Sequence, residues 1–126
     1  MRGPYGETIL EHFRRPRNRG SLRSPSLSQD GTNPLCGDRV RIEVMLDGDV
    51  ITEAGFTANA CAICIASASM LTELVRGAPL EDAATLGVTD LITALDADIP
   101  AARMQCMRLP LTVLHAAIVL HDRRMP

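Results

Sequence analysis

Apolar and polar side chains alternate in the middle of the chain. Every second position there carries an aliphatic residue: Val40, Ile42, Val44 and Leu46. Side chains two positions apart point to the same face of a strand, so this stretch predicts a strand with one buried face. The residues Asp-Gly-Asp at 47–49 favour a tight turn, and a second apolar run follows at 50–56. Together these features predict a β-hairpin.

A short helix is predicted before the hairpin. Apolar residues near the start of the chain recur with the period of a helix: Tyr5, Ile9, Leu10 and Phe13. Pro16 restricts the residue before it and so predicts the end of a short amphipathic helix. The stretch 18–32 is rich in Ser, Gly, Asn and Pro and has no periodicity, which predicts a loop with at most a short edge strand.

Helices are also predicted after the hairpin. One covers 62–76 and has a face of small residues, so another element is expected to pack closely against it. One side of this helix carries Ile63, Ser67, Met70 and Leu74. Two short helices are predicted at 79–86 and 89–95. The apolar stretch 109–120 predicts a buried C-terminal helix with Pro110 in its first turn. Strands followed by helices, without alternation of the two, predict an α+β fold.

Size and composition favour one domain and exclude some functions. The 126 residues are 46% hydrophobic, enough for one core, so residues 1–126 are predicted to form a single domain. Thirteen arginines, no lysine and 15 acidic residues leave a net charge of −2. The absence of lysine excludes Schiff-base catalysis. The chain has neither a clustered basic footprint nor aromatic stacking platforms, so no nucleic-acid partner is expected.

The chain shows no sign of secretion or membrane insertion. No basic and then apolar leader stands near its start, and its longest run of small and apolar residues is shorter than the ~18 residues of a membrane span. A soluble, cytoplasmic protein with no membrane partner is expected. Cysteines are kept reduced in that compartment, which favours metal or thiol chemistry over disulfides. The chain has four cysteines: Cys36, Cys61, Cys64 and Cys106.

Three of these cysteines and one aspartate have positions suited to a metal site. Cys36 and Asp38 stand two residues apart, so an extended stretch would point both toward one ion, with Gly37 allowing the backbone to bend. Cys61 precedes the long helix and Cys106 is predicted to precede the C-terminal helix, where the helix dipole favours a thiolate. Three thiols and a carboxylate from separate elements could form a tetrahedral site.

Simpler roles compete with this interpretation. A lone cysteine is commonly a small buried hydrophobe, and Cys64, one turn into an apolar helix, fits that role best. Asp38 could be a turn or cap carboxylate that accepts a nearby backbone hydrogen bond. His12, His115 and His121 are expected to be hydrogen-bonded within the fold or exposed to solvent rather than to bind a metal.

Two further functions stay open at this point. Cys61 and Cys64 form the CxxC spacing of a thiol-disulfide oxidoreductase at a helix N-terminus. That motif requires a parallel strand-helix-strand context, which the pattern does not predict. A structural metal-binding domain would use the same cysteines without transferring anything.

Three segments of the chain resemble the IscU/SufU/NifU-type iron–sulfur cluster assembly scaffold family. They are NPLCGDRVRIEVMLDGD at 33–49, CAICIASASMLTELVRG at 61–77 and PAARMQCMRLPLTVL at 100–114. The start of the chain fits the same family pattern through Tyr5, Ile9, His12, Pro16, Arg17, Asn18 and Gly20. The resemblance therefore covers nearly the whole chain, to a domain of the NifU-like N-terminal type.

The resemblance implies a fold, a site and partners. The fold is α+β, a small antiparallel sheet with helices packed on one face, as in SufU and IscU. Its ligands for a [2Fe-2S] cluster or zinc would be Cys36, Asp38, Cys61 and Cys106, with Cys36 and Cys106 as candidate persulfide acceptors. Sulfur would come from a PLP-dependent cysteine desulfurase and clusters would pass to acceptor apoproteins. This is the role of a scaffold or carrier, or of a zinc-dependent sulfurtransferase in the SufU type.

The chain combines features of two branches of that family. Arg103, three residues before Cys106, resembles SufU, whereas the short interval from Cys61 to Cys106 resembles IscU. Gln105 stands where the IscU type has a histidine, so a ligand role of that histidine is absent. Ala60 replaces the usual glycine before the second cysteine.

Asp38 would differ from the other ligands of such a site, because it offers an oxygen rather than a sulfur. A hard carboxylate oxygen is a poor match to a thiolate-rich centre, so its bond is expected to open first. As a partly exposed loop residue, it is expected to contribute little to folding.

Overall fold

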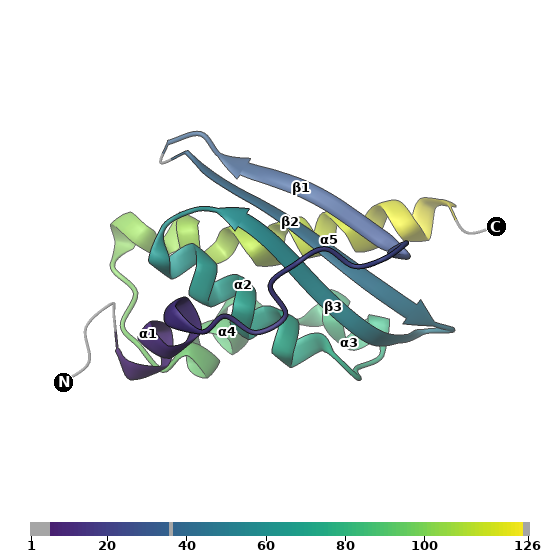
Figure 1. Ribbon diagram of the computed structural model, residues 1–126, viewed down its shortest axis with the longest axis horizontal. Helices are drawn as coiled ribbons and strands as arrows, with labels where there is room; N and C mark the ends of the chain where they lie inside the picture. Colours follow the sequence, from purple (N-terminus) through teal and green to yellow (C-terminus); the bar gives the residue numbers. More distant parts are fainter. Residues whose placement is uncertain (1–5, 36, 125–126) are drawn as a thin grey trace.

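The computed structural model describes residues 6–35 and 37–124 of the chain (Figure 1). Its elements follow in the order α1 (Glu7–Arg14), β1 (Leu27–Asn33), β2 (Asp38–Asp47), β3 (Val50–Asn59), α2 (Ala62–Val75), α3 (Leu80–Thr85), α4 (Val88–Leu95), the 3₁₀ helix η1 (Ala101–Arg103) and α5 (Met104–Arg124).

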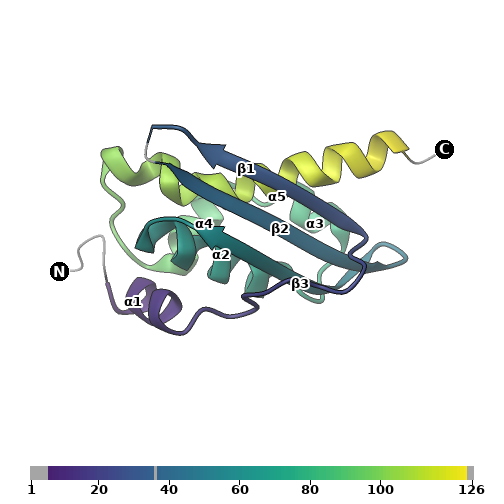
Figure 2. The same ribbon diagram turned by 45° about the horizontal axis from the view of Figure 1, so that its top comes forward.

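The strands form one antiparallel sheet in the order β1-β2-β3. Helices α2 and α5 pack on one face of it, and α3 and α4 pack behind them (Figures 1 and 2). Helix α1 lies beside α2. The α+β fold with helices on one face of a small antiparallel sheet is therefore confirmed. No helix in the described part of the chain is long and apolar enough to cross a membrane.

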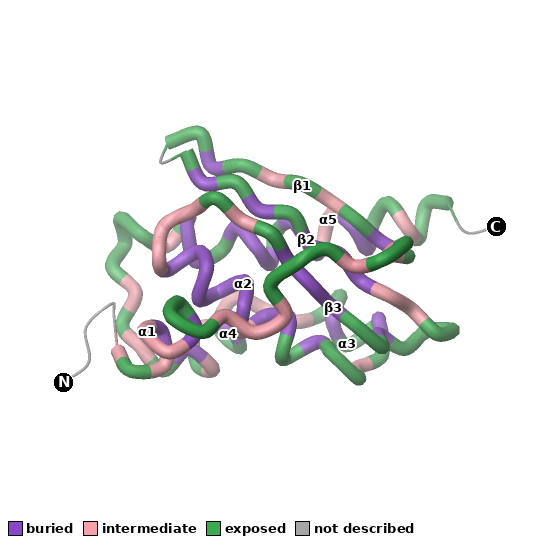
Figure 3. Tube along the Cα trace, viewed as in Figure 1, coloured by how far each residue is buried: buried purple, intermediate pink, exposed green. Residues whose placement is uncertain are grey.

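The alternating pattern of β2 correctly predicted a buried inner face. Val40, Ile42 and Val44 are almost completely buried under the helices, and Arg39 and Arg41 are exposed on the outer face. Figure 3 shows the alternation of buried and exposed positions along β2. The predicted hairpin joins β2 to β3. Its pairing shifts register between Met45 and Leu46, and Leu46 is only partly buried.

Strand β1 is longer than predicted, since the sequence indicated a loop with at most a short edge strand in this region. All seven of its residues pair with β2, although most of its side chains are polar. Leu27 is buried, and Gly31 admits helix α5, because a Cβ at this position would overlap Val113. A polar edge strand that buries so few apolar side chains has little period-2 signal.

The N-terminal helix was predicted correctly, although Tyr5 lies outside the described residues. Ile9 and His12 are its buried residues, and Phe13 is 40% exposed. Helix α1 ends at Arg14, as Pro16 predicted.

Residues 15–26, which we call the N-terminal strap, follow α1 and cross part of the sheet's outer face (Figure 1). The strap meets β3 at Phe56, whose N–H donates to the Asn18 carbonyl at 3.1 Å and whose carbonyl accepts the Gly20 N–H at 2.7 Å. Farther along the strap, the Leu22 N–H donates to the Glu43 carboxylate at 2.8 Å. This cover explains why Glu43 is only 6% exposed on an outer face where other charged residues are open to solvent.

Helix α2 is buried on nearly every side. Ten of its fourteen residues are buried, including Ser67 and Ser69, and the small side chains allow the close packing that the sequence predicted. The side that carries Met70 and Leu74 is its more open one, since Met70 is only partly buried and Leu74 is 40% exposed.

Helix α5 begins earlier than predicted. It starts at Met104 rather than near Leu109, so Pro110 lies inside the helix and not in its first turn. Proline has no N–H, so the usual helical bond from position 110 to the carbonyl of Cys106 cannot form. The predicted short helices at 79–86 and 89–95 are present as α3 and α4.

A buried histidine connects α1 to α2. His12 Nδ1 lies 2.7 Å from Ser69 Oγ, and the same oxygen accepts the Arg17 N–H at 2.8 Å. Burial, and then the positive charge of Arg17, lower the pKa of His12 below its ordinary value, against weaker opposing effects of Glu73 and Glu11. The neutral ring is therefore the form that the fold favours, and His12 is hydrogen-bonded within the fold, as expected.

Stability should consequently fall in mild acid. Because the folded pKa of His12 is lowered, its contribution is complete above the ordinary value of 6.5 and is lost as the pH falls through the folded value. We expect the free energy of unfolding in urea to decrease more steeply between about pH 7.5 and about pH 5.5 in the wild type than in His12→Gln. His121→Gln, near the other end of the molecule, should keep the wild-type slope. Equal slopes for all three proteins would contradict this role of His12.

Candidate metal centre

Three of the predicted site residues converge at one end of the molecule. Asp38 begins β2, Cys61 precedes α2 and Cys106 lies in the first turn of α5, at the left end of Figure 1. One potential ligand atom from each lies within 4.8 Å of the other two. Asp38 and Cys106 are 2% and 1% exposed, whereas Cys61 is partly exposed.

Asp38 holds the start of helix α2. Its Oδ1 accepts the backbone N–H of Cys61 at 3.0 Å, and its Oδ2 lies 3.9 Å from Cys61 Sγ. Cys61 is the N-cap residue, so this bond satisfies one of the N–H groups that a helix start leaves without an internal partner. The expectation of a partly exposed loop carboxylate is wrong: Asp38 is a buried strand residue with a structural bond, and it combines the cap role with a position in the cluster.

Cys36, the fourth predicted ligand, lies outside the described residues. Its neighbours form a turn between β1 and β2, in which Asn33 Oδ1 accepts the Leu35 N–H at 3.2 Å and the Asn33 carbonyl accepts the Gly37 N–H at 2.8 Å. Gly37 has a φ of +73°, which glycine adopts without strain. Gly37 therefore does not have the extended backbone expected between the two ligands, and a ligand role for Cys36 stays a prediction.

Cys106 was expected ahead of the C-terminal helix but lies within it, because α5 begins at Met104. A hydrogen bond that the sequence analysis did not predict fixes this part of α5 against α2: Ser67 Oγ donates to the Met107 carbonyl at 2.6 Å. The only sequence signal for it is a serine in an apolar helix, where a buried hydroxyl needs a partner.

The remaining candidates have other surroundings. Cys64 is completely buried within α2, as its apolar neighbours predicted, and its thiol is not part of the cluster formed by the three converging residues. His115 Nε2 lies 3.2 Å from the carbonyl of Ala83. Within the described residues, the candidate centre includes none of the three histidines and does not include Cys64.

The donor atoms fit a thiophilic ion. Four tetrahedral ligands around zinc lie about 3.8 Å from one another, so atoms within 4.8 Å need only a small closure to share one ion. Two thiols with one carboxylate match zinc or iron better than calcium or magnesium, which prefer oxygen ligands alone. The arrangement can therefore hold a metal ion or cluster between three elements.

Comparison with protein families identifies the family of the chain. The model of the NifU-like N-terminal domain matches residues 4–125. The chain belongs to this family. It is thereby a member of the iron–sulfur cluster assembly scaffold proteins that include SufU, IscU and NifU.

Individual relatives of the NifU-like family cover both branches. The chain is 42% identical to the zinc-dependent sulfurtransferase SufU of Bacillus subtilis over 65% of its own length and 55% of that protein. It is 38% identical to the iron–sulfur cluster assembly scaffold protein IscU of Aquifex aeolicus over 90% of its length and 73% of that protein. The nitrogen fixation protein NifU of Azotobacter chroococcum is 37% identical over 90% of the chain, which spans 37% of that longer protein.

Solved structures of NifU-like proteins have the same fold. The N-terminal part of a NifU-like protein from Brucella abortus aligns with a TM-score of 0.81 at 21% identity, covering 97% of this chain and 96% of that one. A SufU from Fervidobacterium islandicum aligns with a TM-score of 0.75 at 24% identity, covering 90% and 96%.

Two replacements of Asp38 should separate its bond to Cys61 from its charge. Asp38→Ala leaves the buried Cys61 N–H without this acceptor and should lower the free energy of unfolding by about 1–3 kcal/mol. Asp38→Asn can keep an oxygen at the Oδ1 position and should lose clearly less. Urea unfolding with a metal chelator present measures the difference without a contribution from metal binding. Equal losses in both variants would show that the bond to Cys61 contributes little.

Two buried serines on α2 allow a matched test of how Cys106 is positioned. Ser67→Ala should destabilise the fold by about 1 kcal/mol, because it removes one buried hydrogen bond, and Ser69→Ala by at least as much, because it removes the contacts with both His12 and Arg17. Only Ser67 contacts α5 beside Cys106, so only its replacement should weaken zinc binding, by about tenfold in competition with a chromophoric chelator. An equal effect of both replacements on zinc affinity would mean that general destabilisation is responsible.

Proposed function

We propose that this protein accepts sulfur from the persulfide of a PLP-dependent cysteine desulfurase. It would hold zinc or a [2Fe-2S] cluster on Cys36, Asp38, Cys61 and Cys106, and would pass clusters or sulfur to acceptor apoproteins. The observation that carries the proposal is the convergence of a carboxylate and two thiols from three different elements. Family membership supports the scaffold role, and relatives named for zinc and for cluster assembly support both cargoes.

The thiols of the site supply the chemistry. When bound there, a zinc ion favours the thiolate form of its cysteine ligands. In sulfur acceptance, a thiolate of this chain attacks the outer sulfur of the donor persulfide. The donor's sulfur–sulfur bond breaks, its cysteine leaves as a thiolate, and a persulfide remains on this chain without net oxidation or reduction. A reducing compartment such as the cytoplasm would preserve these thiols.

Burial counts against one of the two candidate acceptors. Cys106 is 1% exposed inside the first turn of α5, so a partner's persulfide could not reach its sulfur without movement of that helix. We therefore assign sulfur acceptance to Cys36, with Cys61 and Cys106 as the ligands that stay in place. Asp38 would be the ligand that gives way, because its hard oxygen binds a thiophilic ion least strongly.

The fold does not favour a thiol-disulfide oxidoreductase. All strand pairs of the sheet are antiparallel, and no parallel strand-helix-strand unit surrounds Cys61 in the described structure. Cys64 is completely buried, whereas a resolving thiol has to meet its partner sulfur and then be reduced again.

Four single cysteine variants test the proposal. Cys36→Ala, Cys61→Ala and Cys106→Ala should each lose stoichiometric zinc or iron, and Cys36→Ala should no longer stimulate alanine release by the desulfurase. Cys64→Ala, the control, should retain both properties. Asp38→Asn should retain metal but accept sulfur more slowly. Metal analysis beside the desulfurase assay measures both effects, and full metal occupancy without Cys106 would refute the ligand set.

A further inference from the structure

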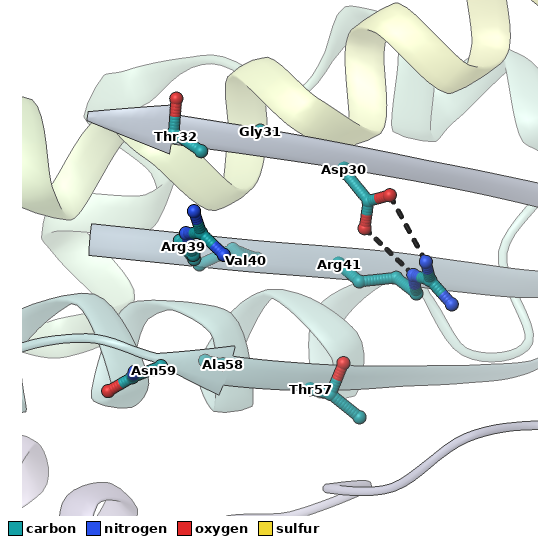
Figure 4. A pocket seen from close by; sticks show the side chains of 9 residues that line it. All are labelled: Asp30, Gly31, Thr32, Arg39, Val40, Arg41, Thr57, Ala58 and Asn59. Atoms are coloured by element: carbon teal, nitrogen blue, oxygen red, sulfur yellow. Dashed lines mark hydrogen bonds and ion pairs between the residues drawn. The ribbon is translucent and has the colours of Figure 1, made fainter. Parts of the chain in front are cut away.

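A groove with charged and polar side chains in its lining crosses the outer face of the sheet, on the opposite side from the helices. Its volume is about 500 Å³. Polar side chains from all three strands line it: Asp30, Thr32, Arg39, Arg41, Thr57 and Asn59 (Figure 4). The N-terminal strap covers another part of this face around Glu43, so the groove is a part that is left open.

The charges of the groove do not cancel. Arg41 pairs with Asp30 through two hydrogen bonds of 2.7 and 3.1 Å, and this contact lowers the pKa of Asp30 and keeps the pair ionic. Among the described residues no carboxylate pairs with the exposed Arg39. A third guanidinium lies at the border, where Arg19 donates to the carbonyl of Ala58 at 3.2 Å. Two cations, Arg39 and Arg41, therefore meet one carboxylate, Asp30, in the lining of the groove, while Arg19 and the buried Glu43 lie outside the lining.

The sheet register surrounds the surplus charge with neutral polar groups. Arg39 pairs across the strands with Thr32 on one side and Asn59 on the other. All three side chains belong to the outer face, and Figure 4 shows them in one row across the groove. A guanidinium between a hydroxyl and an amide is a suitable arrangement for a carboxylate, which accepts hydrogen bonds from each of these groups.

The groove adjoins the candidate metal centre. Arg39 directly follows Asp38 on β2, and its side chain points to the outer face while that of Asp38 is buried. On β3, Asn59 precedes Cys61 by only two residues. A segment bound in the groove would thus lie at the same end of the sheet as the thiols.

We propose that this groove is a docking site for an extended acidic segment of a partner protein. The identity of the partner as sulfur donor or cluster acceptor rests on the proposed function, but the acidic character of the segment rests on the groove. The chain carries a net charge of −2, so its overall field does not attract acidic partners and the attraction has to be local. The groove is lined by three consecutive residues of each strand, and an extended chain bound there would direct carboxylates at every second residue toward the same face.

The test uses a fluorescent peptide of about eight residues with glutamate at alternate positions, and a matched peptide with glutamine instead. Fluorescence anisotropy should show binding of the acidic peptide only. Arg39→Gln should weaken it about fivefold, the effect of losing one exposed charge contact. Arg123→Gln removes an exposed arginine from the far end of α5 and should bind as the wild type does. Melting curves verify that both variants are folded.

Three results would overturn the docking site. Binding to Arg39→Gln as tight as to the wild type would exclude this groove. Equal weakening in Arg39→Gln and Arg123→Gln would indicate attraction by net charge alone. Displacement by free glutamate or inorganic phosphate at the concentration of the peptide would indicate a small-anion site. The desulfurase assay on the same proteins is independent: sulfur acceptance without peptide binding refutes the groove alone, and peptide binding without sulfur acceptance refutes the proposed function alone.

Discussion

The enclosure of α2 is the constraint on which the rest of the structure depends. A helix with ten of fourteen residues buried can contact the sheet, α1, α4 and α5 only if its side chains are small and its hydroxyls have partners inside the protein. Ser69 meets this requirement toward α1 and the N-terminal strap, and Ser67 meets it toward α5. Because both serines are held in this way, the start of α2, where Cys61 stands, has little freedom to move.

The bond between Asp38 and Cys61 explains how a buried carboxylate could also serve as the labile ligand that we propose. Oδ1 accepts the Cys61 N–H, and Oδ2 lies 3.9 Å from the Cys61 sulfur. If the metal contact is made through Oδ2, its opening leaves the hydrogen bond of Oδ1 in place. The helix start and the two thiols would then keep their positions while one coordination position opens. A ligand fixed by a separate structural bond can exchange without loss of the site around it.

The sequence predicted best those helices and strands that bury one side and expose the other. The β2 alternation predicted the hairpin, and Pro16 predicted the end of α1. Strand β1 was underestimated because its pairing and its contact with α5 through Gly31 use backbone rather than apolar side chains. The start of α5 was misplaced because Pro110 favours the first turn of a helix, whereas packing on α2 and the sheet holds the helix past it.

The sequence predicted the three described residues that converge in the candidate site, but not their geometry. Ligand types and order predicted Asp38, Cys61 and Cys106, yet the bond from Ser67 to a carbonyl 40 residues away has no local signature. Strand β2 shows why geometry matters: alternation buries Asp38 beside the thiols and exposes Arg39 in the groove. A register slip of one residue would exchange these two faces. The candidate metal centre and the groove are thus set by the same strand register, and neither could change sides without the other.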